Sequence, residues 1–183
     1  MDTYLPSIRK QFAYYRQLGQ RTLDQVPDEG LHWEYQPGQN SLAVIVKHLH
    51  GNMLSRWTNF LTEDGEKTWR QREAEFDNDL PDRAAIQQAW TEGWSCLEAA
   101  LAPLTTADLE RIIYIRNDGH TVMEAINRQL CHYSYHVGQM VLLGKMIQGE
   151  QWESLSIPRG QTKAFNDQKF QQEKARRHFT DKD

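Results

Sequence analysis

Cysteine is scarce in this chain of 183 residues, since it has only two, and they form no CxxC pair. Cys96 and Cys131 each fall within a helical pattern, so a reducing cytoplasm is the compartment we expect. Apolar runs of about 18 residues are absent, so we expect no membrane-spanning helix, and the first ten residues lack the apolar core of a secretory signal. The net charge of −4 offers no general attraction for nucleic acid or anionic membrane.

The composition is that of a globular protein, with 39% hydrophobic and 25% charged residues. The length suits one domain with a substantial core. We expect that domain to span residues 1–166 and a polar, flexible tail to occupy residues 167–183. Six tryptophans and seven tyrosines suit a bulky core, a dimer face or an aromatic-lined pocket, and composition does not choose among these.

Helical periodicity appears in four segments, at about residues 2–25, 41–61, 82–101 and 121–147. Ser41 is a suitable N-cap for the second segment, and Thr121 with Glu124 forms a capping-box pattern at the start of the fourth. Residues 111–116 are the one stretch that suits extended structure. These patterns predict an all-α fold, an antiparallel four-helix bundle.

Histidine supplies the clearest chemical signal. His132 and His136 are four residues apart in the fourth segment, so both imidazoles project from one helix face and can bind one metal ion. The zinc-protease pattern HExxH is absent, because Tyr133 stands where that motif has glutamate. Packing or hydrogen-bonded histidines are the alternative interpretation of the pair.

A third ligand would have to come from the second segment, which offers His48 and His50. Two residues apart on a helix, these side chains point to different sides, so only one is expected to join the site. His50 lies nearer the centre of the apolar stripe, whereas His48 shares a polar row with Asn52 and Arg56. Periodicity leaves the choice open.

The order of these motifs resembles the DinB/YfiT-like superfamily of metal-binding four-helix-bundle proteins, over about residues 1–166. The similarity lies in a histidine followed by leucine in the second helix and an HxxxH pair followed by Gly-Gln in the last. A little-characterised branch of the superfamily is resembled most, through Gly51-Asn52, Arg56-Trp57, Phe60-Leu61, Asp64-Gly65-Glu66-Lys67, Arg70, Pro158-Arg159-Gly160-Gln161 and Phe165-Asn166. The resemblance implies that His48, His132 and His136 are the metal ligands, that His50 is only a neighbour, and that the protein is a homodimer.

Three neutral imidazoles leave a divalent ion, with zinc or nickel expected first, at least one open coordination position. A thiol bound there becomes a thiolate, and bound water becomes a nucleophile near neutral pH. The resemblance favours the thiol, because characterised relatives include transferases that use low-molecular-weight thiols and a mycothiol-dependent isomerase. We therefore expect a thiol-S-transferase-like enzyme that attacks a small electrophile. The alternatives are a metal-dependent hydrolase and a non-catalytic bundle that binds a small molecule or a protein.

Several other side chains are candidates for the pocket. Asn52 and Arg56 follow His48 by one and two helical turns, and Arg56 could hold a carboxylate of the thiol or substrate. Gln139 could orient His136. The resemblance places Arg159 near the mouth of the bundle. For the others we expect a solvated acidic turn at Asp64 and Glu66, a packed Cys131, and no chemistry at His32, His120 or His178.

Overall fold

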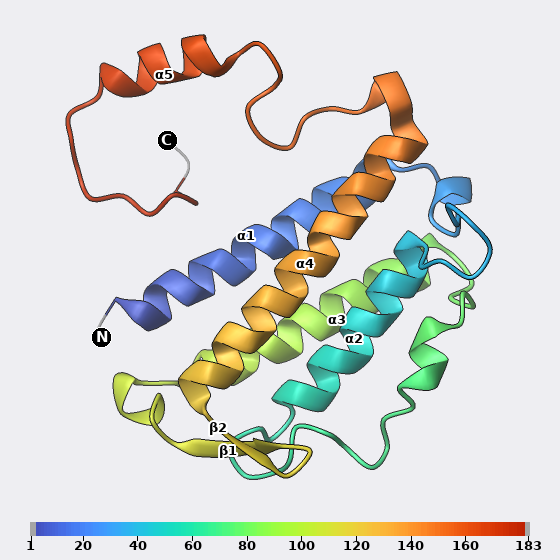
Figure 1. Cartoon of the computed structure of the whole chain (residues 1–183), viewed down its shortest axis with the longest axis vertical. Coiled ribbons are helices and arrows are strands. Elements are labelled where there is room, and N and C mark those ends of the chain that lie inside the picture. The colour runs from blue at the N-terminus through green and yellow to red at the C-terminus, as the bar shows by residue number, and fades with distance from the viewer. Residues whose placement is uncertain (1–2, 182–183) are drawn as a thin grey trace.

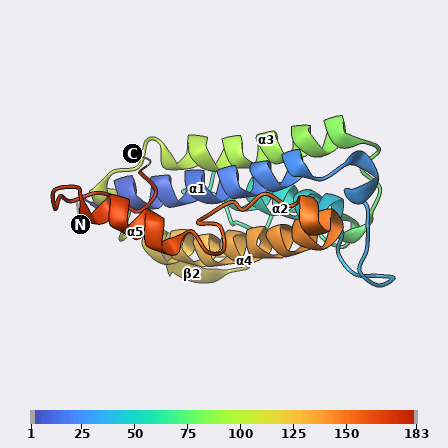
Figure 2. The same ribbon diagram turned by 90° about the horizontal axis from the view of Figure 1, so that it is seen from above.

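Four long helices lie side by side in the computed structural model, which describes residues 3–181 (Figures 1 and 2). They are α1 (Tyr4–Gln25), α2 (Leu42–Trp57), α3 (Arg83–Leu101) and α4 (Val122–Gln148). α2 packs against α3 and α1 against α4, and further contacts join α2 to α4 and α1 to α3. The chain is mostly helical, as the periodicity predicted.

Capping explains where two of these helices begin. The Ser41 hydroxyl accepts a hydrogen bond from the backbone N–H of Val44, at 3.2 Å. Thr121 and Glu124 form the expected capping box, in which each side chain accepts the other's backbone N–H. These two caps set the starting points of the helices that carry the histidines.

The structure contains a two-stranded antiparallel sheet, which the expected all-α fold did not include. β1 (Ile112–Ile115) pairs with β2 (Asp118–Thr121), with Ile112 opposite Thr121. The strands are joined by Arg116 and Asn117, whose φ angles of 57° and 64° give the left-handed backbone of a tight hairpin turn. The periodicity did not predict β2, because its residues show no apolar alternation.

Other boundaries also differ from those predicted. α2 ends at Trp57 rather than near residue 61, since Thr58 is extended and Asn59 has a φ of 49°. A fifth helix, α5 (Thr162–Phe170), crosses the expected domain boundary at residue 166. Four short 3₁₀ helices, η1 (Asp28–Gly30), η2 (Glu73–Phe76), η3 (Thr106–Asp108) and η4 (Gly149–Gln151), lie in the connections.

The tail, expected to be flexible, contacts α1 in its described part. The ring of His178 lies 3.0 Å from the hydroxyl of Ser7, and the rings of Phe179 and Tyr14 meet edge to face with centroids 5.6 Å apart. The chain therefore returns along α1 after α5.

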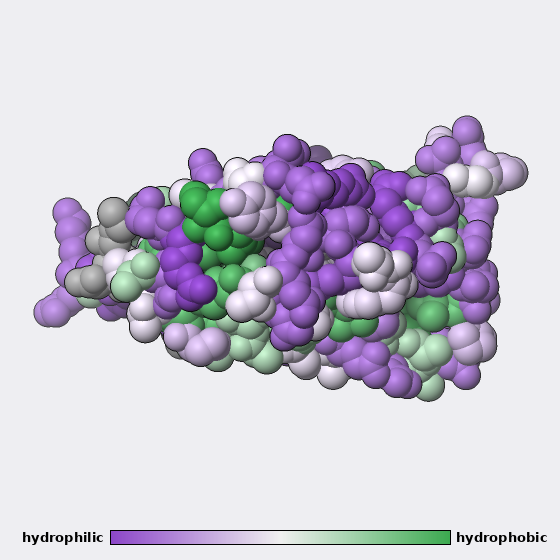
Figure 3. Space-filling model, turned by 90° about the horizontal axis from the view of Figure 1, so that it is seen from below, coloured by the Kyte–Doolittle hydropathy of each residue, from purple (hydrophilic) through white to green (hydrophobic). Residues whose placement is uncertain are grey.

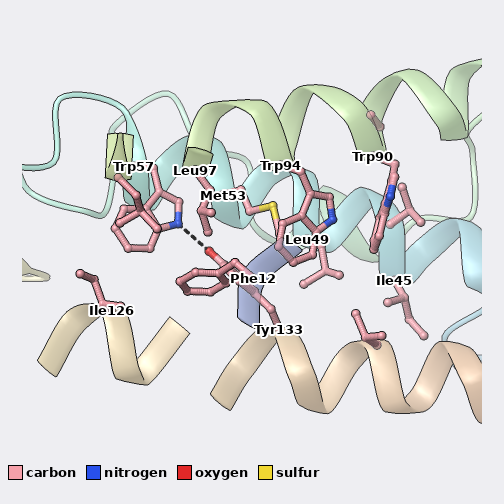
Figure 4. Close-up of a cluster of buried hydrophobic side chains, with 14 of the residues drawn as sticks. Phe12, Ile45, Leu49, Met53, Trp57, Trp90, Trp94, Leu97, Ile126 and Tyr133 are labelled. Carbon is pink, nitrogen blue, oxygen red and sulfur yellow. Dashed lines mark hydrogen bonds between the residues drawn. The ribbon is translucent and has the colours of Figure 1, made fainter. Parts of the chain in front are cut away.

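Aromatic side chains fill the core between the helices (Figure 4). Trp57, Trp90 and Trp94 are almost fully buried, and Trp94 meets Phe12 edge to face. The indole N–H of Trp57 donates to the hydroxyl of Tyr133 at 2.9 Å. Half of the tryptophans thus serve the core.

The surface is predominantly hydrophilic on the face shown in Figure 3, at the end of the bundle that the hairpin closes, although separate green apolar areas interrupt it. Within residues 3–181, no helix combines the length and apolar character needed to cross a membrane.

Candidate metal centre

Three histidine rings converge between α2 and α4. The Nε2 atom of His132 lies 3.3 Å from Nε2 of His48 and 3.1 Å from Nε2 of His136. Around a tetrahedral zinc ion with bonds of about 2.0–2.1 Å, neighbouring ligand nitrogens stand roughly 3.3 Å apart. The donor set and its spacing therefore suit a metal, and this cluster could hold a divalent ion.

His48, not His50, joins this cluster. The imidazole of His48 is buried and stacks on Phe76 with centroids 5.0 Å apart, whereas His50 faces Glu92 of α3 at 3.2 Å. The apolar stripe was a poor guide because α2 is buried on nearly every side, so both apolar and polar rows of this helix face protein.

Hydrogen bonds at Nδ1 hold two of the rings in one orientation. Nδ1 of His48 donates to Glu75 at 2.9 Å, and Nδ1 of His136 donates to the side-chain oxygen of Gln139 at 2.8 Å. Both partners accept at these atoms, so the proton sits on Nδ1 and the lone pair on Nε2 faces the centre. The expected role of Gln139 thus has a geometric basis.

The surroundings favour the neutral form of two of the rings, those of His132 and His136. Burial, together with the nearby His136 and His48 rings, lowers the pKa of His132 to about 3. Burial and the neighbouring His48 lower the pKa of His136 to about 4. A histidine must be deprotonated at the coordinating nitrogen to bind a metal, so both are ready at neutral pH.

Glu75 is a candidate supporting residue of the cluster that the sequence did not reveal. It belongs to η2, inside the connection at 58–82 that looked merely polar and acidic. Arg70 donates to its two carboxylate oxygens at 2.7 and 2.9 Å, and both side chains are buried. Burial raises the pKa of Glu75, but the hydrogen bonds from His48 and Arg70 outweigh it and hold that pKa below its ordinary value. An ionised carboxylate therefore supports His48.

Asn52 lines the cavity that opens over the three histidines, and its amide is held in one orientation. Its side-chain oxygen accepts a hydrogen bond from the hydroxyl of Tyr133 at 3.1 Å, and Tyr133 in turn accepts from Trp57. Because the oxygen is engaged, the amide N–H₂ is the group left to face the cavity.

Arg56 lines the same cavity but already has protein partners. It donates to the carbonyl of Gly65 and to the carboxylate of Glu66, and it is buried. Among the residues described, its Nε atom is buried without a hydrogen-bond partner. Its first role in this structure is to support the turn at residues 63–67.

The acidic turn at Asp64 and Glu66 is not simply solvated, contrary to expectation. Asp64 accepts the backbone N–H groups of Arg116 and Asn117 at 2.8 and 2.9 Å, which ties the turn to the hairpin. Glu66 pairs with Arg56, Arg70 and Arg116 at 3.0–3.3 Å.

Two further expectations do not match the structure. Arg159 is exposed and does not line this cavity, because the chain after η4 leads away from α2. Cys131 is exposed rather than packed.

A cavity of about 390 Å³ opens over the histidines. Five arginines and no aspartate or glutamate line it within the described part of the chain. Its lining residues are Asn40, His48, Asn52, Arg56, Arg70, Arg72, Phe76, Arg116, Arg128, Gln129, His132, Tyr135 and His136. Carboxylates outside the lining pair with four of these arginines, and Arg128, which has no carboxylate partner among the described residues, leaves a positive side chain for an anionic group.

Comparison with known proteins shows one family. The model of the family described as "Protein of unknown function (DUF1572)" matches residues 1–161. The chain belongs to this family. No curated protein and no solved structure matches it. The description of DUF1572 names no activity.

Proposed function

We propose that this DUF1572 protein is a divalent-metal-dependent enzyme that activates a thiol for attack on a small electrophile. The observation that carries the proposal is the convergence of three imidazoles, from His48, His132 and His136, at an open cavity. The resemblance to the DinB/YfiT-like superfamily supports the same proposal.

His48, His132 and His136 would hold a divalent ion with an open position, and such an ion would lower the pKa of a thiol bound there. All-nitrogen ligation favours zinc or nickel. Glu75 and Gln139 hold the rings of His48 and His136 with Nε2 towards the point where the three histidines meet.

The carboxylates near the centre favour a thiol over water as the nucleophile. Hydrolysis commonly uses a carboxylate as general base, yet Glu75 is bound by His48 and Arg70, and Glu66 by three arginines. A thiol has an ordinary pKa of about 8.5 and needs no such base once it is coordinated.

The cavity walls orient the reactants. Arg72, Arg116 and Arg128 offer positive charge to a carboxylate or phosphate on the thiol or electrophile, and Asn52 offers an amide donor. In the proposed reaction the thiol sulfur forms a bond to the electrophilic carbon. The thiol proton passes to solvent, and the leaving group departs with the bonding electron pair.

The test uses protein purified without a histidine tag and loaded with cobalt(II) in place of the native ion. We expect about one ion per chain and a thiolate-to-cobalt charge-transfer absorption on adding mercaptopropionate, stronger at equal concentration than with neutral mercaptoethanol. His136→Ala should lose the ion, whereas His50→Ala, the matched control on α2, should keep it. Protein that binds no ion, or binds one without any thiolate absorption, would refute the proposal.

A further inference from the structure

A second cavity, of about 380 Å³, lies beside the metal centre and differs from it in chemistry. Its walls are mostly apolar, with Tyr35, Ile45, Leu142, Leu143 and Met146 among them. The arginine-lined cavity, by contrast, has Phe76 and Tyr135 as its only large apolar or aromatic side chains among the described residues, apart from the histidines.

The two cavities adjoin one another. Asn40 lines both. Gln139 lines the second cavity while it holds Nδ1 of the ligand candidate His136, and its amide donates to Tyr135 of the first at 3.2 Å. The boundary between the cavities is therefore a pair of polar side chains.

The side chains that line the two cavities follow one another along the same face of α4. On α4 the lining residues of both cavities recur at steps of three and four along one face: His132, Tyr135, His136, Gln139, Leu142, Leu143 and Met146. On α2, Ile45 precedes His48 by one turn. At 1.5 Å per residue, Leu143 lies about 10 Å along α4 from His136, within reach of a small molecule.

Exposure of the apolar side chains points to an occupant. Leu142 is 58% exposed and Met146 45%, four residues apart on one helix. Large apolar side chains grouped in a concave site with polar groups at one end are typical of small-molecule binding.

We propose that this second cavity, here named the apolar annex, binds the alkyl or aryl group of the molecule that reacts at the three-histidine centre. The substrate class is then an amphipathic small molecule, with its polar end at the histidines and its apolar end over Leu142 and Met146. This inference rests on the proposed function, since it needs an ion at the histidines.

The test measures binding of straight-chain hydroxamates to the zinc-loaded full chain by calorimetry, because a hydroxamate group binds zinc directly. Acetohydroxamate should bind at the centre alone, and affinity should rise about two- to fourfold per added methylene up to octanohydroxamate. Leu142→Gln and Met146→Gln should each flatten this rise without changing zinc content or acetohydroxamate affinity. Ile157→Gln, at an exposed apolar position outside the annex, is the matched control and should preserve it.

The outcomes separate the two proposals. If zinc-loaded protein binds no hydroxamate at all, the open metal centre fails and the annex with it. If acetohydroxamate binds but chain length has no effect, or the effect survives Leu142→Gln, the annex is wrong while the metal centre stands. A change of oligomeric state in Leu142→Gln by light scattering, with no chain-length effect in the wild type, would assign this face to a subunit contact and overturn the inference.

Discussion

Gly51 makes the contact between His48 and Glu75 possible, and replacing it is the sharpest test of the supporting carboxylate. A Cβ atom at position 51 would lie 2.4 Å from Oε1 and 2.7 Å from Cδ of Glu75. Glu75 is not free to swing away, since it accepts hydrogen bonds from His48 at 2.9 Å and from Arg70 at 2.7 and 2.9 Å. The Gly51→Ala change must therefore displace the carboxylate.

The size of the effect follows from the geometry. Ordinary contact begins near 3.4 Å, so Oε1, which accepts from Nε of Arg70, must retreat from 2.4 Å by 1.0 Å, and Cδ must retreat from 2.7 Å by 0.7 Å. The whole carboxylate therefore moves, and with it Oε2, the atom that accepts from Nδ1 of His48. Loss of such a support for a metal-bound histidine typically lowers metal affinity about 10- to 100-fold, or roughly 1.4–2.7 kcal/mol. The gain in helix propensity from glycine to alanine, about 1 kcal/mol, acts on folding and does not restore this contact.

Competition with a chromophoric zinc chelator measures the affinity. Gly138→Ala is the matched control, because its Cβ would have no atom within 4 Å. We expect it to keep zinc affinity unchanged and to melt at the same or a higher temperature. Zinc affinity in Gly51→Ala within twofold of the wild type would show that Glu75 does not support the site.

Three further predictions concern charge. Glu75→Gln should lower zinc affinity about 10- to 100-fold, whereas Glu73→Gln, on the same short helix but 91% exposed, should leave it unchanged in the chelator assay. In zinc-free protein, His132 and His136 have folded pKa values of about 3 and 4 against 6.5 when unfolded, so the unfolded chain takes up protons first as pH falls. Stability should be full above pH 6.5 and decline towards pH 4, by at most about 1.4 kcal/mol per pH unit for each ring before solvent screening. The urea midpoints at pH 7 and pH 5 should differ less in the variant that combines His132→Gln with His136→Gln. An equal difference in the wild type and in this variant would refute the view that these two histidines cause the loss of stability. Asp64→Asn should lower stability by about 1.5–3 kcal/mol, because the charged acceptor for hairpin N–H groups is lost, yet leave zinc affinity intact; an unchanged melting temperature would contradict this.

Local signals account for the part of the fold that could be predicted. The caps at Ser41 and Thr121 depend on residues three positions apart, and the HxxxH spacing places two rings on one helix face whatever the rest of the chain does. Only the first strand of the hairpin was predicted from the sequence. The residues of β2 show no apolar alternation, and their pairing with β1 across the turn cannot be read from a local pattern.

Long-range packing decides what could not be predicted. Glu75 reaches His48 across 27 residues, from a segment with no helical or strand period. Arg70 pairs with the buried carboxylate of Glu75, and Gly51 leaves the space that this carboxylate occupies. Neither contact can be predicted from the sequence alone. Periodicity left the choice between His48 and His50 open for a related reason, since an apolar stripe identifies one buried face and α2 has several.

The arrangement of the three histidines favours a cation-binding role over a role in stabilising the fold. The Nε2 atom of His132 faces two other Nε2 atoms at 3.1 and 3.3 Å, and the Nδ1 bonds of His48 and His136 leave those two nitrogens as acceptors. A proton on Nε2 of His132 can make only one of these two contacts a full hydrogen bond, so in the absence of a ligand one buried Nε2 lone pair lacks a donor of its own. A fold selected for stability alone would separate such groups or replace them with apolar side chains. A cation at their meeting point would give these lone pairs a partner. Because zinc would bind the folded chain in preference to the unfolded one, it should raise the free energy of unfolding of the wild type by about 2.7 kcal/mol at a hundredfold excess over its dissociation constant. Thermal melts with and without zinc should show that increase in the wild type and lose it in His132→Gln, and equal increases in both would place the ion elsewhere.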